Sequence, residues 1–207
     1  GLIGVYVLEP AEPLPPMTQE DLEFERFQIK AVSAIEEELD RILKTRKQSR
    51  IQTIADMVIR NYGHLDEKIN FYQNLRSLED YVSRHSLNVA ILCAMITHVM
   101  NIRREEQYHT VCAALLHDMG KLKKHEDVYF GAPYSREDAI RNCETQEEAY
   151  SVIEDAFATE GPAIRRICQQ AAGKQLDLFP EEGKESRYKM LEGSNVLLVA
   201  NRYDEIT

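Results

Sequence analysis

The sequence predicts an all-α protein, a bundle of six or more helices packed around one hydrophobic core. Apolar residues recur at three- and four-residue steps along most of the chain, which is the period of a helix with one buried face. A β-like run is confined to the start of the chain. The 207 residues, 43% of them hydrophobic, are enough to bury one good core.

The two ends of the chain differ from its helical middle. The opening "GLIGVYVLEP" is β-like and leads into the proline-rich "EPAEPLPP", so residues 1–16 are predicted to be a strand remnant followed by a linker. The last residues, "LLVANRYDEIT", have a helical pattern with no glycine or other stop signal. We therefore expect the sequence to be a fragment of a longer protein, truncated at both ends.

Residues 17–76 are predicted to form a helical arm, an antiparallel pair of long helices that stands apart from the rest of the chain. The first helix begins after Thr18 and the second after the basic turn "KTRKQSR", with Gly63 as a break within it. Each has a narrow apolar stripe: Phe27, Val32, Ile35, Leu39 and Ile42, then Ile51, Ile54, Val58, Leu65 and Ile69. A packed hairpin is the simpler interpretation, and the same stripes would also serve a homodimer interface.

The helix predicted over residues 81–100, "YVSRHSLNVAILCAMITHVM", places a histidine on its buried face. His85 shares that face with apolar residues at three- and four-residue steps, namely Val82, Val89, Leu92, Ile96 and Val99. A buried imidazole needs a hydrogen-bond partner, and an isolated one is more often a satisfied core histidine than a metal ligand. The histidines off such stripes are interpreted as surface or capping groups: His64, His98, His109 and His125.

The next helix, from about Glu105, ends at the adjacent His117 and Asp118 in "AALLHDMGK", with Gly120 predicted as its left-handed cap. One interpretation is a metal site, because imidazole nitrogen and carboxylate oxygen suit iron, manganese or zinc, and Lys121 would face a metal-bound phosphate. The other is a polar helix end, where His117 and Lys121 favour the helix dipole and Asp118 pairs with Lys121. These residues alone leave both interpretations open.

The composition limits the class of partner and the compartment. A formal charge of −10 and a pI near 5.2 disfavour nonspecific binding to nucleic acid or to anionic membrane surfaces. Four cysteines stand singly without a CxxC pair, which indicates neither a disulfide framework nor a zinc knuckle and fits a reducing cytoplasm. No stretch is long and apolar enough to insert into a membrane.

Three ordered stretches, "YVSRHSLNVAILCAM", "AALLHDMGK" and "LLVANRYDEIT", resemble the HD superfamily of metal-dependent phosphohydrolases. They look most like its HD-GYP branch, bacterial signalling proteins known for hydrolysing cyclic di-GMP. The resemblance covers about residues 80–207 and implies an HD-GYP-like domain over residues 77–207. It also implies that the helices bearing the three motifs converge on one pocket, because ligands on separate helices meet only where those helices pack together.

The resemblance implies a set of functional residues. It places metal ligands at His85, His117 and Asp118. It gives Asp118 and Lys121 catalytic roles. The residues expected to bind phosphate are Lys121, Arg165 and Arg166.

The family's last metal carboxylate falls on Asn201, and its following aspartate falls on Asp204. The two lie three residues apart on one helical face, so a metal would be met by a neutral amide oxygen or by a shifted Asp204. Either ligand would hold the ion more weakly than the family's carboxylate does.

Further signatures of the HD-GYP branch are largely absent. Its histidine after the HD motif falls in "IRNCETQEEA", where Cys143 is nearest, and its "HHE" falls on Cys168, Gln169 and Gln170. Its "GYP" has become "LDLFP", with only Pro180 kept. Because glutamine is a poor substitute for imidazole, most ligands of a second metal are missing.

The expected function follows from this reduced site. We expect at most one divalent metal, iron, manganese or another, or none. The protein would then be a cytoplasmic signalling or regulatory module with weak or no phosphodiesterase activity, binding a nucleotide or cyclic dinucleotide. The alternative is an active metal-dependent phosphohydrolase on such a substrate. In a third interpretation the resemblance reflects helical packing only, and the polar residues satisfy one another in the core.

Overall fold

A computed structural model describes residues 18–65, 81–123, 135–174 and 189–206. Within these ranges every regular element is a helix, so the predicted all-α class is confirmed. The elements are α1 (Gln19–Thr45), α2 (Ile51–Tyr62), α3 (Tyr81–Val99), α4 (Arg104–Leu116), the 3₁₀ helix η1 (Met119–Lys123), α5 (Arg136–Tyr150), α6 (Ile153–Phe157), the 3₁₀ helix η2 (Ala158–Glu160), α7 (Gly161–Lys174) and α8 (Glu192–Ile206). The predicted strand remnant and linker, residues 1–16, and Pro180 lie outside the described residues.

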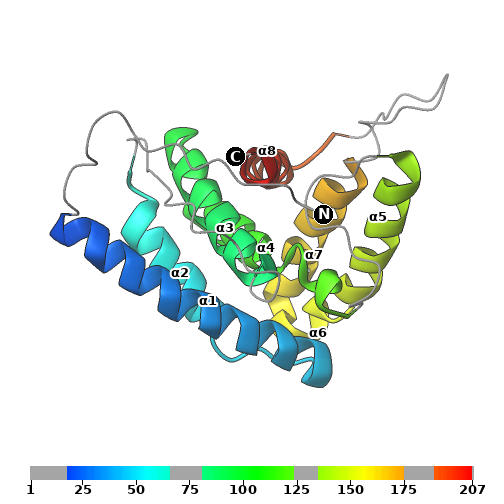
Figure 1. Cartoon of the computed structure of the whole chain (residues 1–207). Helices are drawn as coiled ribbons and strands as arrows, with labels where there is room; N and C mark the ends of the chain where they lie inside the picture. The colour runs from blue at the N-terminus through cyan, green and yellow to red at the C-terminus, as the bar shows by residue number, and fades with distance from the viewer. Residues whose placement is uncertain (1–17, 66–80, 124–134, 175–188, 207) are drawn as a thin grey trace, which may run out of the picture.

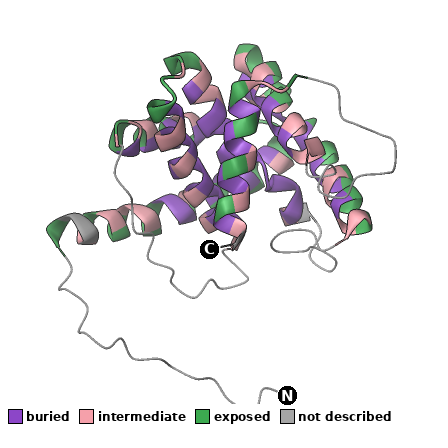
Figure 2. Ribbon diagram, turned by 90° about the horizontal axis from the view of Figure 1, so that it is seen from above, coloured by how far each residue is buried: buried purple, intermediate pink, exposed green. Residues whose placement is uncertain are grey.

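Helices α3 and α4 form the centre of the bundle. They pack against each other, with α1 and α2 on one side and α5, α6 and α7 on the other, while α8 lies against α3, α4 and α7 (Figure 1). The buried residues of these helices face this centre (Figure 2). None of the described helices is both long and apolar enough to span a membrane.

Helix α3 is buried on more than one face because α1, α2, α4 and α8 all pack against it. His85 is fully buried, as its stripe predicts, and so are Ser86 and Thr97 on other faces. The predicted stripe does not run to the end of the helix, since Val99 in the last turn is 66% exposed. Helix α3 therefore carries polar groups into the core, where each needs a hydrogen-bond partner.

The two N-terminal helices do not stand apart from the rest of the chain, contrary to the prediction. Ile35, Leu39 and Ile42 of α1 are fully buried in the same hydrophobic core as α3 and α4. Helix α2 packs against α3 and α4 and ends at Tyr62, with Gly63 as its capping residue. The narrow stripes face the body of the same chain, which supplies the partner surface that an isolated helical pair would lack.

A buried carboxylate joins α1 to the start of α2. Glu38 is fully buried, and its Oε2 accepts hydrogen bonds from the backbone N–H groups of Ser49 (2.7 Å) and Arg50 (2.8 Å). Backbone donors at the start of a helix lack partners within the helix, so the carboxylate supplies one. Arg41 also donates to Oε1 of Glu38 at 3.0 Å. Glu38 thus fixes the turn between the two helices.

Gly120 lies where α5 approaches η1 closely, and it is not the left-handed cap that the sequence predicts. Helix α4 ends at Leu116, and the capping residue is His117, which has right-handed helical backbone angles. A Cβ atom at Gly120 would lie 2.6 Å from Oε1 of Gln146 and 2.7 Å from the carbonyl oxygen of Thr145. The glycine is therefore required by close packing between η1 and α5 and not by a positive φ angle.

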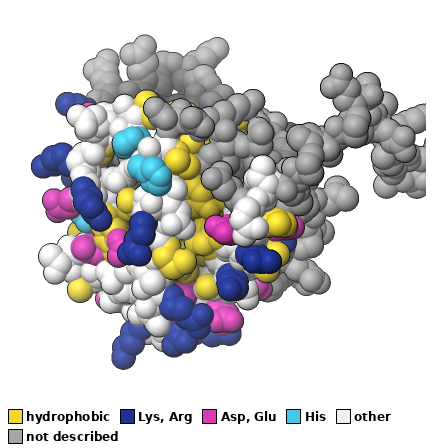
Figure 3. Space-filling model, turned by 90° about the vertical axis from the view of Figure 1, so that its left-hand side faces the viewer, with side chains coloured by type: hydrophobic (Ala, Val, Ile, Leu, Met, Phe, Trp, Pro, Cys, Tyr) yellow, Lys and Arg dark blue, Asp and Glu magenta, His cyan; other side chains and the backbone are white. Residues whose placement is uncertain are grey.

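The outer surface carries charges of both signs. Figure 3 shows one face of the molecule, where Lys and Arg side chains lie among Asp and Glu side chains with apolar atoms between them. Two large apolar side chains of the N-terminal helices remain exposed, Ile29 of α1 (60%) and Met57 of α2 (40%).

Candidate metal centre

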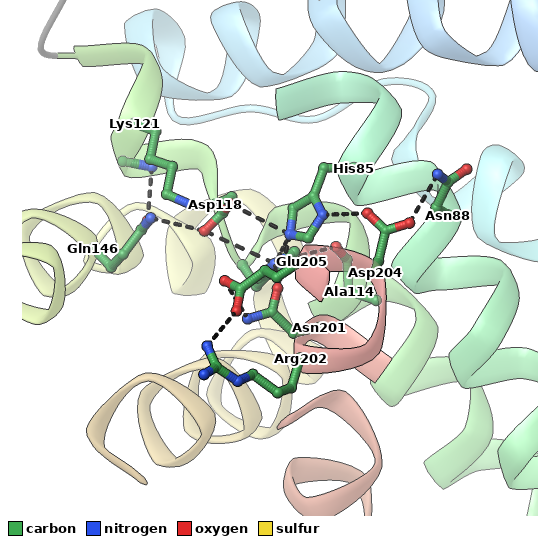
Figure 4. Close-up of polar contacts among 12 residues, drawn as sticks. His85, Asn88, Ala114, Asp118, Lys121, Gln146, Asn201, Arg202, Asp204 and Glu205 are labelled. Carbon is green, nitrogen blue, oxygen red and sulfur yellow. Dashed lines mark hydrogen bonds and ion pairs between the residues drawn. The ribbon is translucent and has the colours of Figure 1, made fainter. Parts of the chain in front are cut away.

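Three helices bring polar side chains to one point in the core, as the sequence predicts. His85 comes from α3 and Asn201 comes from α8 (Figure 4). His117 follows the end of α4. Oδ1 of Asn201 lies 2.7 Å from Nε2 of His85 and 2.9 Å from Nε2 of His117. The two Nε2 atoms are 3.2 Å apart. All three residues are buried.

The carboxylate of Asp118 completes this group. Its Oδ2 lies 3.6 Å from Nε2 of His85, and its Oδ1 lies 3.8 Å from Nε2 of His117. One ligand atom from each of His85, His117 and Asp118 lies within 4.8 Å of the other two. Metal–nitrogen and metal–oxygen bonds are about 2.1 Å, so ligands of a single ion lie roughly 3 to 4 Å apart. The spacing therefore suits one cation.

The ring of His117 directs a lone pair toward this point. Its Nδ1 lies 2.8 Å from the backbone oxygen of Ala114, which can only accept, so Nδ1 carries the hydrogen. Burial lowers the pKa of His117 below its usual value, although the Asp118 carboxylate opposes the effect. The ring is therefore neutral at pH 7, and its Nε2 is an acceptor.

The amide of Asn201 also presents an acceptor. Its Nδ2 donates to Oε1 of Glu205 at 3.2 Å, which turns Oδ1 toward the two imidazole rings. Oδ1 of Asn201 and Nε2 of His117 are then two acceptors with at most one hydrogen, that on Nε2 of His85, to share, and the Asp118 carboxylate lies beside them. Buried acceptors without donors are costly, whereas a divalent cation satisfies all of them. The donor set therefore fits a metal ion.

Both oxygens of Asp118 have a donor from the protein. Lys121 donates to Oδ2 at 2.5 Å, and Gln146 of α5 donates to Oδ1 at 3.1 Å. Burial raises the pKa of Asp118, but the positive charge of Lys121, the largest of the opposing effects, helps to hold the pKa well below its usual value. The Asp118–Lys121 pair expected for a polar helix end is therefore present and buried. It lies beside the atoms of His85 and His117 that are expected to bind a metal.

Asp204 lies outside the group of ligand atoms. Its Oδ2 is 2.6 Å from Nδ1 of His85, the ring nitrogen that faces away from Asn201 (Figure 4). Its Oδ1 accepts a hydrogen bond from Nδ2 of Asn88 at 2.9 Å. The residue expected as a shifted ligand thus contacts His85 at Nδ1, whereas Asn201 contacts the same ring at Nε2.

The two arginines expected to bind phosphate lie away from this group. Arg165 of α7 donates to Glu154 at 3.0 Å and to Glu147 at 3.2 Å, both on the surface. Arg166 is exposed. Neither arginine lines the pocket beside the metal centre.

The residues aligned with the missing "HHE" have separate contacts. Cys168 is buried beside the pocket, and its thiol donates to the backbone oxygen of Ala113 at 3.6 Å. Gln169 donates to Glu147 on the surface. Oε1 of Gln170 accepts from the N–H of Leu191 and the hydroxyl of Ser194 at the start of α8.

Several contacts of the site are missed by the sequence prediction. Gln146, and not Cys143, is the α5 residue that reaches Asp118. The two residues are three positions apart and share one helical face, so the period of α5 could have indicated it. The hydroxyl of Tyr150 donates to the backbone oxygen of His117 at 2.6 Å, which supports the end of α4.

A small pocket, partly open to solvent, adjoins the candidate metal centre. Its walls are His117, Asp118, Asn142, Gln146, Tyr150, Cys168, Ala171, Ala172, Leu197, Leu198 and Asn201. Among these lining residues Asp118 alone is ionised at pH 7, since burial and the low pKa described above leave His117 neutral and Asp118 charged. The wall opposite the ligand atoms is therefore neutral and largely apolar.

One comparison with known proteins gives a match. A family model described as HD domain matches residues 82–192, more than half of the chain, and this range holds His85, His117 and Asp118. Asn201 lies beyond the matched residues. No curated protein and no solved structure matches the chain.

Proposed function

Because the chain belongs to the HD domain family, we propose that it binds one divalent cation at His85, His117 and Asp118, and through it a phosphate-bearing ligand. The observation that carries this proposal is the convergence of buried acceptor atoms within 4.8 Å of one another. The amide oxygen of Asn201, 2.7 Å and 2.9 Å from the two Nε2 atoms, is proposed as a neutral fourth ligand. Iron and manganese accept such a mixed nitrogen and oxygen set.

Lys121 is the proposed phosphate-binding residue of the site. When bound, the cation would supply Lewis-acid polarisation of a phosphate group and activation of water. The Lys121 ammonium now balances the charge of Asp118, and a cation on Asp118 would free it to donate to a phosphate oxygen. We do not extend this role to Arg165, because two glutamates already hold its guanidinium.

The surroundings of Asp118 support a single cation. A second ion bridged by this carboxylate would compete with the Gln146 amide for Oδ1. The residues described contain one group of three or more side chains suited to a metal, and the adjoining pocket wall is neutral. With one cation instead of two, the charge clamp on the phosphate is weaker, so we propose weak or no hydrolysis of cyclic di-GMP and a signalling or regulatory role.

A second candidate function is an active phosphohydrolase that uses one metal on a nucleotide or cyclic dinucleotide. It is favoured by the complete set of His85, His117 and Asp118 with a buried Lys121 beside them. Both candidates share the cation site and differ in turnover.

We further propose that the N-terminal helices pass on a signal or hold a homodimer. Their stripes are buried within the chain, so a partner would have to cover the exposed side chains of Ile29 and Met57. The free cysteines, three of them buried, support the proposal of a cytoplasmic location.

Turnover separates the two candidates. Hydrolysis of cyclic di-GMP and of nucleoside monophosphates is measured with added manganese or iron, for the natural sequence, for His117→Ala and for His98→Ala, whose histidine is exposed. The proposal expects little cyclic di-GMP product from any of them. Robust hydrolysis that His117→Ala abolishes and His98→Ala retains would establish the active phosphohydrolase instead.

A further inference from the structure

Helix α8 places a carboxylate behind the ring of His85. Oδ2 of Asp204 lies 2.6 Å from Nδ1 of His85, and both side chains are buried. An ionised carboxylate only accepts hydrogen bonds, so a contact this short requires a hydrogen on Nδ1. The opposite ring atom, Nε2, is then the one that can offer a lone pair to a cation.

Two neighbours hold this arrangement in place. Asn88, one turn after His85 on α3, donates to Oδ1 of Asp204 at 2.9 Å and so restrains rotation of the carboxylate. Tyr81, one turn before His85, stacks on the imidazole with ring centres 5.6 Å apart and planes at 16°. The ring of His85 is thus fixed in its plane by Tyr81 and in its direction by Asp204.

We propose that Asp204 is a positioning residue of the metal centre: it keeps the hydrogen of His85 on Nδ1 and turns Nε2 toward the cation. The effect of Asp204 on cation affinity rests on the proposed function. The position of the hydrogen on His85 does not. To act as a ligand itself, Asp204 would have to leave both His85 and Asn88, and its oxygens are not in the group of ligand atoms around His117 and Asp118. Carboxylates that orient a metal-bound histidine raise metal affinity, and their loss costs about 10- to 100-fold.

The first test is made on the natural sequence without metal. Nitrogen NMR of ¹⁵N-histidine-labelled protein, with two-bond proton correlations, reports whether each ring nitrogen carries a hydrogen, and the spectrum of His85→Gln identifies the signals of His85. At pH 9, above the range in which imidazoles ordinarily titrate, we expect a hydrogen on Nδ1 of His85. A lone pair on Nδ1 would overturn the proposal.

The second test compares variants of two neighbouring carboxylates on α8. Asp204→Ala removes the acceptor, so cobalt affinity, followed by the visible absorption of the bound ion, should fall about 10- to 100-fold and the Nδ1 hydrogen signal of His85 should be lost or shifted. Asp204→Asn keeps one acceptor oxygen for the two donors His85 and Asn88 and should lie in between. Glu205→Gln, which alters the partner of Asn201, should leave the Nδ1 hydrogen of His85 in place.

The outcomes separate this inference from the proposed function. Unchanged cobalt affinity and an unchanged His85 spectrum in a folded Asp204→Ala protein would overturn the role of Asp204. If the natural protein binds no cobalt, the proposed function fails while the Nδ1 measurement still decides where the hydrogen lies. If Asp204→Ala loses its helical circular dichroism, the spectrum of the natural protein alone decides.

Discussion

At the scale of single residues, the centre of the pocket is a cluster of polar groups inside an apolar core. Nε2 of His117, Oδ1 of Asn201 and the Asp118 carboxylate face one another, while their donor hydrogens point outward to Ala114 and Glu205. Without a cation such a cluster costs folding free energy. Natural proteins tolerate such a loss of stability at functional sites, so the cluster is consistent with a binding function.

The residues of this cluster differ in how far the sequence predicts them. His85 could be placed inside from its stripe, and the sequence motif around His117 and Asp118 indicated their shared chemistry. Gln146 and Glu205 are missed, although the period of α5 places Gln146 on the same face as Cys143 and Glu205 lies one turn after Asn201 on α8. The period shows which face a residue lies on but not which polar partner its side chain reaches.

Replacing Lys121 by methionine tests the charge balance at this scale. Lys121 and Asp118 are both buried, so Lys121→Met leaves a carboxylate without its ammonium partner and should lower the free energy of unfolding by about 3–5 kcal/mol without metal. Added manganese should restore part of that loss in thermal unfolding, because the ion replaces the missing charge. Equal melting temperatures of variant and natural protein without metal would contradict this account of the pair.

At the scale of the elements, the joints between helices depend on close contacts that the sequence pattern does not reveal. The sequence predicts that Gly120 ends α4 with a left-handed turn. In the structure Gly120 instead allows η1 to pack closely on α5. The turn between α1 and α2 is held by Glu38, a charged residue on the otherwise apolar face of α1. Periodicity predicts the helices, whereas these contacts depend on how two helices meet.

Glycine-to-alanine changes test the close approach of α5. Gly120→Ala places Cβ against the backbone oxygen of Thr145 and should destabilise the fold by about 1–3 kcal/mol. Gly173→Ala in α7 is the matched control, because a Cβ there meets nothing within 4 Å and should be neutral or stabilising by up to about 1 kcal/mol. Urea unfolding measures both, and equal effects would refute the packing argument.

The carboxylate of Glu38 can be tested in the same way against its neighbour. Glu38→Ala leaves the N–H groups of Ser49 and Arg50 without their buried acceptor and should cost about 1–3 kcal/mol of unfolding free energy. Glu37→Ala removes a solvent-exposed partner of Arg50 and should change little. Similar urea midpoints for the two variants would show that Glu38 does not fix the turn.

At the scale of the whole molecule, one core includes the N-terminal helices. The narrow apolar stripes of α1 and α2 predict a separate arm, although Ile35, Leu39 and Ile42 are buried against the body of the bundle. A stripe of apolar residues shows that a helix needs a partner surface but does not identify it. The location of that surface, in the same chain or in another, is set by tertiary packing.

Thiol reactivity reports on the integrity of this core. Burial raises the pKa of Cys93, Cys112 and Cys168, so at pH 8 almost none of these thiols is ionised and reactive. Cys143 is only half-buried, although its pKa is also raised, first by burial and then by nearby glutamates. We expect a thiol reagent to modify Cys143 first in the folded protein and the other three only on unfolding. Rapid modification of all four under native conditions would contradict the described packing.

The number of metal ions bound per chain tests the central claim most directly. Protein purified without chelator and titrated with manganese in a calorimeter should bind one ion per chain, His98→Ala should bind one as well, and His117→Ala should bind none or bind at least 100-fold more weakly. Binding of two ions by the natural sequence, or undiminished binding by His117→Ala, would contradict a single cation held by His85, His117 and Asp118.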